Sequence, residues 1–288
     1  MKKVFVSLMA LAGVALMSAP AHAVTYQFLD DNSPGRCAVT SGSGGSYGST
    51  GNAYGCQTQE SAANAANSMT VQAFANTGAS TSSGSKFAAA AVNDHDNNSG
   101  ADADLWGFGA SFAGESQSSP QHSLDNDGKL EFFLLSFTES IALTSVQLGW
   151  WSNDSDISVL AYTGADVGNA VSAIGSSTES TLLATGWDLV GSYRDLGLDE
   201  TSINASGISS SYWIISAYSD AFSGTSGNGS DYVKLTKITG NFTCANSNDP
   251  SCAPPPPAVP EPASLALVGV ALLGAFGGRR RALKAQKA

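Results

Sequence analysis

The residues between 24 and 243 form short apolar or alternating runs, which Gly, Ser, Asn and Asp interrupt at short intervals. No apolar period of 3.6 residues continues long enough to give a helix one buried face, whereas such short runs suit strands. Around ten strands over roughly 220 residues predict an all-β single domain, an antiparallel β-sandwich of jelly-roll type. We expect the strands at residues 25–29, 69–75, 87–92, 105–112, 130–137, 141–151, 157–162, 181–190, 212–218 and 232–242.

The alternation within one strand predicts which tryptophan is buried. In the run 141–151 a period of two puts Trp150 on the buried face, together with Val146 and Leu148. The same period leaves the neighbouring Trp151 on the exposed face. We therefore expect Trp150 in the core and Trp151 at the surface.

Three other segments carry local signals. Residues 130–137 are apolar on both faces, which predicts a strand covered on both sides. In 232–242 the alternation slips by one at Thr236 and Lys237, which predicts a β-bulge. Residues 64–75 are Ala-rich, so a helical turn is an alternative to a strand there.

The first 23 residues have the order of a secretory signal peptide. Lys2 and Lys3 precede an apolar run at 4–17, and Ala21 and Ala23 are the small residues that signal peptidase reads. An uncleaved N-terminal anchor is the alternative, which the short run and the cleavage motif disfavour. We expect export and cleavage after Ala23, so that the β-domain spans residues 24–243.

Export places the four cysteines in an oxidising compartment. They are Cys37, Cys56, Cys244 and Cys252. Three pairings are possible, and the one that closes the two shortest loops joins Cys37 to Cys56 and Cys244 to Cys252. No C-x-x-C motif is present, so the cysteines predict neither a zinc site nor redox chemistry.

The C-terminal part consists of a Cys- and Pro-rich linker, residues 244–259, and a tail, residues 260–288. Four consecutive prolines at 254–257 predict an extended spacer. The apolar segment 263–278 would be ~24 Å long as a helix, short for a hydrocarbon layer of ~30 Å. The basic residues that follow, Arg279, Arg280 and Arg281, stay in the cytoplasm by the positive-inside rule, which puts the domain outside.

The order of parts in this tail resembles the PEP-CTERM sorting signal of Gram-negative bacteria. Pro260, Glu261 and Pro262 match its Pro-Glu-Pro motif, residues 265–276 its short apolar helix, and residues 279–281 its Arg cluster. The resemblance implies that an exosortase, a membrane-embedded enzyme similar to cysteine transpeptidases, removes the inner-membrane anchor. The product, which lacks the residues beyond about 262, is then released or attached at the outer surface, often in bacteria that make exopolysaccharide.

A second resemblance covers roughly residues 88–162. The segment 119–126, the Phe-rich run after it, and Leu148-Gly149-Trp150-Trp151 with residues 154–162 are similar to exosortase-dependent surface proteins of unknown activity. This resemblance is consistent with a β-sandwich, and it implies no catalytic residue in this chain.

The net charge of the chain excludes one class of partner. Residues 24–259 hold 6 Lys or Arg and 23 Asp or Glu, a net charge of −17, which repels nucleic acid.

Residues 44–48 match the G-x-S-x-G pattern of hydrolases, but the flanking strand and helix that the motif needs are missing. No spacing brings two carboxylates to the separation that glycoside hydrolysis requires. We therefore predict no catalytic residues.

One acidic loop has the oxygen ligands that a hard cation prefers. These are Asp94, Asp96, Asn98, Asp102 and Asp104. Ser99 and Leu105 occupy the positions where an EF-hand needs Gly and an acid, so the loop is either an irregular calcium site or a solvated acidic loop. The segments 125–128 and 154–156 are weaker versions, more typical of turns.

These features lead to three hypotheses. The first is a non-catalytic, exosortase-processed protein of the cell surface or extracellular matrix, associated with exopolysaccharide or biofilm. The second is a carbohydrate-binding module, in which the exposed indole of Trp151 stacks on a sugar. The third is a secreted hydrolase, which the missing catalytic set disfavours.

Overall fold

The computed structural model describes residues 21–28, 37–41, 53–56, 68–77, 85–94, 107–112, 114–115 and 119–243. The chain divides into two compact units, Met1–Ala245 and Asn246–Ala288, and every described residue belongs to the first. The sorting-signal residues, Cys244, Cys252 and most of the acidic loop, Asp96 to Asp104, therefore lie outside the described residues.

The described residues are mostly strands, and all pairings between these strands are antiparallel, as the sequence predicts. The strands are β1 (Ala21–Gln27), β2 (Cys37–Ser41), β3 (Ala53–Cys56), β4 (Met69–Asn76), β5 (Phe87–Asp94), β6 (Phe108–Ser111), β7 (Leu124–Asp125), β8 (Glu131–Asn153), β9 (Ile157–Tyr162), β10 (Trp187–Tyr193), β11 (Thr201–Ser202), β12 (Ser210–Ala217) and β13 (Asp231–Thr243). The all-β prediction is confirmed.

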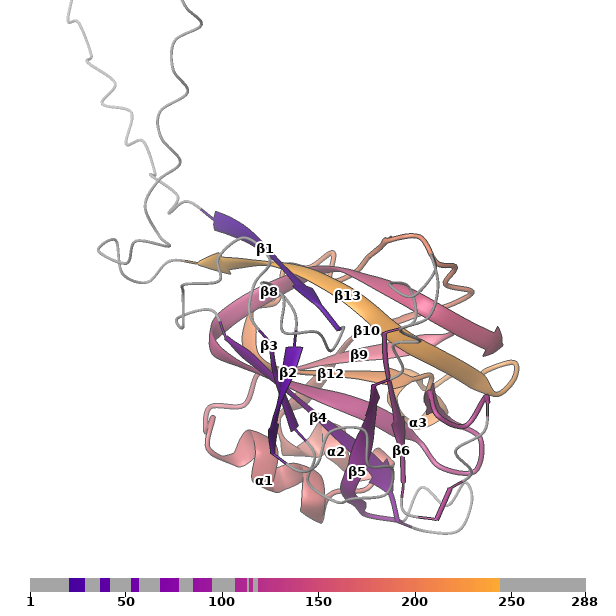
Figure 1. Cartoon of the computed structure of the whole chain (residues 1–288). Coiled ribbons are helices and arrows are strands. Elements are labelled where there is room, and N and C mark those ends of the chain that lie inside the picture. Colours follow the sequence, from indigo (N-terminus) through magenta and orange to yellow (C-terminus); the bar gives the residue numbers. More distant parts are fainter. Residues whose placement is uncertain are drawn as a thin grey trace, which may run out of the picture. The chain divides into compact units, whose positions relative to one another are not determined.

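Five of the strands close into a small barrel. β4 pairs with β8 and β5, β6 connects β5 to β13, and β13 pairs back with β8. From the other edge of β8 the sheet continues through β12, β9 and β10 (Figure 1). The described residues confirm an antiparallel sheet, but they do not confirm a sandwich of jelly-roll type.

The long strand β8 makes this closure possible. Its first part, residues 131–137, pairs with β4 and β12, and its second part, residues 141–153, pairs with β13. The sequence predicts two strands here, 130–137 and 141–151, and the structure joins them into one. β8 therefore belongs both to the barrel and to the sheet that continues to β10.

The first part of β8 also separates two hydrophobic cores, as its two apolar faces predict. Phe133 and Leu135 pack into one core with residues of the barrel strands. Phe132 and Leu134 pack into the other, which includes the buried side of α1 (Asn169–Ser176). All four side chains are fully buried, so this strand is covered on both sides.

The structure contains short helices that the sequence analysis does not predict. They are α1, α2 (Glu179–Leu182), the 3₁₀ helix η3 (Leu183–Thr185) and α3 (Asp220–Ser223). Their apolar stripes are too short to show a helical period; α1 buries only Ala170 and Ile174. The predicted strand 181–190 is wrong up to residue 186, and β10 begins at Trp187. In the Ala-rich segment, residues 69–76 form β4, so the strand prediction holds there.

Three register shifts distort the pairing of β8 with β13: one lies between Thr239 and Gly240, and the other two are β-bulges on either side of Leu235. The predicted bulge at Thr236 is confirmed, because Leu235 pairs with Leu148 and Lys237 pairs with the next residue of β8, Gln147. The second bulge leaves Gly149 as an extra residue on β8, since Lys234 pairs with Trp150.

The second bulge changes the face on which Trp150 lies. Directly paired residues share a face, and successive residues of β13 alternate, so Trp150 lies opposite Leu148. Trp150 is half-buried, with the Lys234 ammonium 6.0 Å from the centroid of its ring, and its predicted place in the core is wrong. Trp151 is 42% exposed, as predicted, because it lies near the end of β8.

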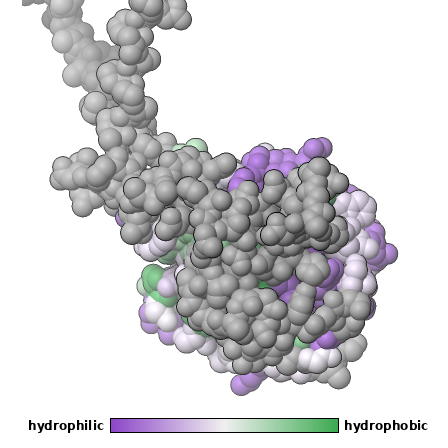
Figure 2. Space-filling model, in the orientation of Figure 1, coloured by the Kyte–Doolittle hydropathy of each residue, from purple (hydrophilic) through white to green (hydrophobic). Residues whose placement is uncertain are grey.

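The described surface has few large apolar side chains. The exposed ones are Trp151, Val167, Val171 and Leu198. In Figure 2 the described part of the surface is mainly hydrophilic or neutral, with only small hydrophobic areas. Such isolated residues are ordinary for a soluble surface and do not by themselves mark an interface.

Candidate functional site

Three carboxyl side chains meet beside the turn that connects β7 to β8. Asp125 ends β7, Glu131 begins β8, and Glu115 follows β6. Asp125 and Glu131 are fully buried. Among the described residues, one oxygen of Asp125 has no hydrogen-bond partner, and the carboxyl group of Glu131 interacts with that of Glu115. Removal from water without a partner is costly for a carboxylate, so the ionised forms are strongly disfavoured.

The pKa values of this buried carboxyl cluster (Glu115, Asp125 and Glu131) rise accordingly. Burial, reinforced by the charge of Glu115, raises the pKa of Asp125 to about 9. Burial raises the pKa of Glu115 to about 7. Burial and the charges of Asp125 and Glu115 raise the pKa of Glu131 well above its ordinary value. The cluster therefore holds protons at neutral pH.

The segment 125–128 is a turn, as its sequence indicates. The amide of Asp127 donates to Oδ1 of Asp125 at 3.0 Å, and Gly128 has a φ of +83°, which favours glycine. The hydroxyl of Tyr232 on β13 donates to Oδ2 of Asp127 at 2.7 Å and ties the turn to the sheet. The ammonium of Lys129 lies 3.9 Å from the centroid of the Phe112 ring.

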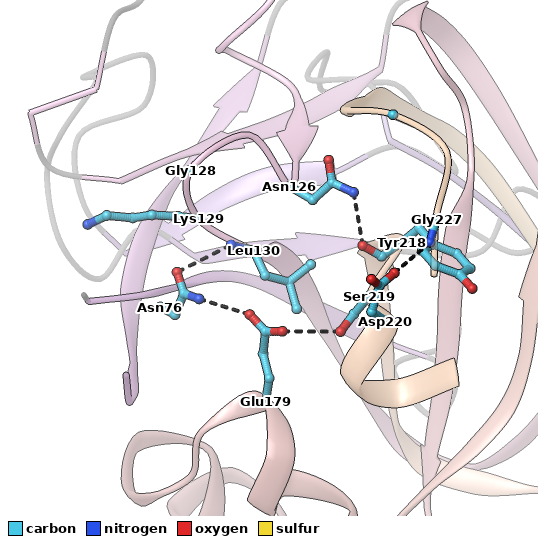
Figure 3. Close-up of a pocket in the computed structure, with 11 residues that line it drawn as sticks. Asn76, Asn126, Gly128, Lys129, Leu130, Glu179, Tyr218, Ser219, Asp220 and Gly227 are labelled. Carbon is cyan, nitrogen blue, oxygen red and sulfur yellow. Dashed lines mark hydrogen bonds between the residues drawn. The ribbon is translucent and has the colours of Figure 1, made fainter. Parts of the chain in front are cut away.

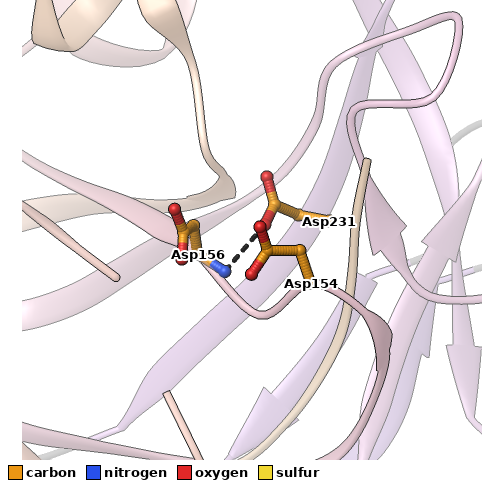
Figure 4. Close-up of side chains that lie close together, drawn as sticks. All are labelled: Asp154, Asp156 and Asp231. Atoms are coloured by element: carbon orange, nitrogen blue, oxygen red, sulfur yellow. Dashed lines mark hydrogen bonds between the residues drawn. The ribbon is translucent and has the colours of Figure 1, made fainter. Parts of the chain in front are cut away.

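A second acidic cluster joins the segment between β8 and β9 to the start of β13. Oxygens of Asp154, Asp156 and Asp231 lie within 4.8 Å of one another (Figure 4). Oδ1 of Asp231 accepts the amide of Asp156 at 2.7 Å, and Oδ2 accepts Nδ2 of Asn126 at 2.7 Å. Burial raises the pKa of Asp231 to about 7 and also raises that of Asp156.

Arg194 supplies positive charge to this three-aspartate cluster. Its Nε lies 3.9 Å from Oδ2 of Asp156. Its Nη2 donates to the hydroxyl of Tyr218 at 2.8 Å and to the carbonyl of Ser226 at 2.9 Å. A metal ion at this cluster would therefore have to compete with a guanidinium that is already in place.

A polar pocket (Figure 3) is lined in part by Asn126, whose side chain also donates to Asp231 of the three-aspartate cluster. Its volume is about 260 Å³, and its walls come from the end of β4, the turn before β8, the start of α2 and the segments on either side of α3. The residues that line it are Asn76, Asn126, Gly128, Lys129, Leu130, Glu179, Tyr218, Ser219, Asp220, Gly227 and Gly229.

Hydrogen bonds hold the walls of the pocket in place. Oε1 of Glu179 accepts Nδ2 of Asn76 at 2.9 Å, and Oε2 accepts the hydroxyl of Ser219 at 3.2 Å. Oδ1 of Asn76 in turn accepts the amide of Leu130 at 3.2 Å. Oδ1 of Asp220 accepts the amide of Gly227 at 2.6 Å. Burial raises the pKa of Glu179 above its ordinary value.

The structure confirms some of the residues predicted from the sequence, and others lie outside the described residues. The disulfide between Cys37 and Cys56 is present, as predicted. Ala21 and Ala23 belong to β1, where they pair with Thr243 and Asn241 of β13, and cleavage between Ala23 and Val24 stays a prediction. The predicted pair Cys244 and Cys252 lies outside the described residues.

The predicted ligand and processing residues are mostly beyond the described part. Asp94 is the last residue of β5, whereas Asp96, Asn98, Asp102 and Asp104 lie outside the described residues. The same is true of Pro260, Glu261, Pro262 and the arginines 279–281. Among the described residues no helix is long and apolar enough to span a membrane, and the expected apolar helix at 265–276 is not among them.

The sequence analysis does not predict the pocket or the carboxyl cluster. Glu131 has a detectable signal, a charge directly before four apolar residues of a strand that is covered on both sides. Asn76 and Glu179 have none, because they are 103 residues apart and only the fold brings them together.

Comparison with known proteins identifies the end of the chain. Residues 258–281 match the family model of the PEP-CTERM protein-sorting motif. No curated protein and no solved structure matches the chain. The match confirms the predicted C-terminal signal and indicates an exported protein that is targeted to an exosortase.

Proposed function

We propose that this exosortase-targeted chain is a non-catalytic protein of the cell surface or extracellular matrix and is associated with exopolysaccharide. The observation that carries the proposal is the sorting motif at 258–281, which follows a domain with a strong excess of acidic residues. Such a domain stays soluble and repels polyanions. Signal peptidase and exosortase are its processing partners, and the inner membrane anchors it only before processing.

The buried titratable groups favour a non-catalytic role. Asp125 and Glu131 are closed off from solvent, so a substrate cannot reach them without rearrangement. His122 is also buried, and its ring centroid lies 6.0 Å from that of Trp150. A general base has to reach the proton that it abstracts. Reproducible glycosidase, esterase or protease turnover, abolished by one substitution, would contradict this part of the proposal.

A carbohydrate-binding function is the second candidate, and two features favour it. Trp151 offers an exposed indole, and the polar pocket offers amide and carboxylate groups. Flat aromatic rings and fixed polar groups are suited to sugars, which have apolar faces and many hydroxyls. This candidate specifies how the association with exopolysaccharide would be achieved.

Retention on the polysaccharide tests the association. We expect the purified protein to be retained on immobilised exopolysaccharide of the producing bacterium and to be released by the soluble polymer. The same matrix without polysaccharide is the control. Equal flow-through on the two matrices would contradict the association with exopolysaccharide. Only the targeting to an exosortase would then be left of the proposal.

Calcium binding at the loop 94–104 is a separate hypothesis, and a solvated acidic loop that requires no metal is the alternative. The three-aspartate cluster already has Arg194 at 3.9 Å from Asp156, whereas the loop is the region where the sequence gathers five oxygen ligands. At a concentration 100-fold above Kd, calcium should stabilise the protein by about 2.7 kcal/mol.

The melting temperature in calcium and in chelator measures this effect. Asp94→Asn combined with Asp96→Asn should abolish the calcium response, and Asp231→Asn should keep it. A melting temperature that ignores both calcium and chelator would discard the metal hypothesis. Loss of the response in Asp231→Asn alone would move the site to the three-aspartate cluster.

A further inference from the structure

We infer that the pocket at Asn76, Glu179 and Asp220 binds one sugar unit of a neutral or amino-sugar polysaccharide and rejects acidic sugars. The inference rests on the proposed association with exopolysaccharide and assigns it a site and a ligand class. Each step follows from the size of the pocket, its hydrogen-bonding groups and its charge.

The size of the pocket sets the size of the ligand. A volume of about 260 Å³ is room for roughly nine waters at ~30 Å³ each. Pockets for drug-sized ligands begin at about 300 Å³. The pocket is therefore suited to one sugar ring, such as a chain end or a side branch, and not to an extended stretch of polymer.

Hydrogen bonds fix the side chains of the pocket walls before a polar ligand binds. Asn76 and Ser219 are buried, and both donate to the carboxylate of Glu179, which fixes its orientation. Asn126 donates to the carbonyl of Tyr218 at 3.0 Å and so holds the opposite wall. Because these groups are already ordered, a ligand does not have to order them on binding.

The free hydrogen-bonding capacity of the pocket is mainly that of an acceptor. A carboxylate offers about four acceptor positions, and the bonds at the pocket use two on Glu179 and one on Asp220. The remaining positions suit ligands that donate hydrogen bonds. Sugar hydroxyls donate, and the ammonium of an amino sugar donates as well as carrying a positive charge.

The charge of the pocket excludes acidic ligands. In Figure 3 the ammonium of Lys129 points away from the other labelled side chains, and it lies over the ring of Phe112. Among the residues that line the pocket, the two carboxyl groups of Glu179 and Asp220 therefore outnumber the one cation, Lys129. A uronate or a phosphorylated sugar would bring a third negative charge to this place.

Titration calorimetry with three defined tetrasaccharides tests the site and the ligand class. The probes are cellotetraose, which is neutral, glucosamine tetramer, which is cationic, and tetragalacturonate, which is anionic. The protein is purified from an exosortase-containing host, in detergent if it stays in the membrane. We expect the first two probes to bind and the third not to bind.

Substitutions locate the site. Glu179→Gln and Asp220→Asn keep the size of each side chain, and each should weaken binding of glucosamine tetramer at least tenfold. Asp199→Asn, at an exposed acid that does not line the pocket, is the matched control and should bind as wild type does. Unchanged melting temperatures show that the variants fold.

The possible results distinguish the assignment of the pocket from the proposed association with exopolysaccharide. If wild type fails to bind the native polysaccharide, the proposed function falls and this inference falls with it. If wild type binds the polysaccharide and the two pocket variants bind equally well, only the pocket assignment is overturned. Loss of binding in Trp151→Ala alone would place the site at that indole. Preferred binding of tetragalacturonate would overturn the ligand class.

Discussion

Replacing Pro260, Glu261 and Pro262 by alanine should leave the protein uncleaved in the membrane of an exosortase-containing host. The three residues lie within the matched sorting motif at 258–281. Proline restricts φ and lacks a donor, so we expect Pro260 and Pro262 to favour an extended backbone at Glu261. We infer that a processing enzyme recognises these three residues, because the sequence has four prolines, residues 254–257, between them and the β-domain.

Mass spectrometry of the membrane and released fractions measures the outcome. Export, the Cys37–Cys56 disulfide and the fold should be intact, because the described domain ends at Thr243. Alanine at Pro254, Pro255 and Pro256 is the matched control, since it removes three prolines outside the matched region. Loss of the tail from the motif variant as efficiently as from wild type would show that the Pro-Glu-Pro assignment is wrong.

The stability of the domain should fall as the pH rises from 5 to 8. Asp125 and Glu131 have raised pKa values in the folded protein, so the folded state holds protons that the unfolded state has lost. Their stabilisation is complete below the ordinary carboxyl pKa of about 4 and disappears as the pH passes the folded values. For Asp125 that value is about 9.

The expected slope is about 1.4 kcal/mol per pH unit for each carboxyl that stays protonated only in the folded state. Urea unfolding at pH 5, 6, 7 and 8 measures this slope. Glu131→Gln keeps the shape of the side chain but cannot ionise, so it should reduce the slope by the contribution of one group. The variant should also be more stable than wild type at pH 8.

Two other charged groups help to identify the source of the pH dependence. Glu200 has a lowered pKa through its bonds to Lys237 and Ser145, so its contribution is lost towards acid pH and opposes the predicted trend. Asp199→Asn changes an exposed acid outside the carboxyl cluster and is the control variant for the urea unfolding. Stability that stays constant or rises between pH 5 and 8 would show that the carboxyl cluster is not protonated in the folded protein.

Features that depend on residues close together in the chain could be predicted from the sequence. The sorting motif is a contiguous signal, and the strand character of residues such as 157–162 follows from their composition and short length. The closing of a short loop correctly indicated the Cys37–Cys56 pair. The slip of alternation at Thr236 also identified its bulge, because a break in a period of two is visible within one strand.

Features that depend on pairing between distant segments could not be predicted from the sequence and are seen only in the folded domain. The extra residue Gly149 moved Trp150 to the other face, since a one-residue slip against β13 reverses the direction of every later side chain. The barrel closes through pairing of β4 with β8, and of β6 with β13. The carboxyl cluster and the pocket likewise gather side chains from separate elements, and the period of one strand does not encode their proximity.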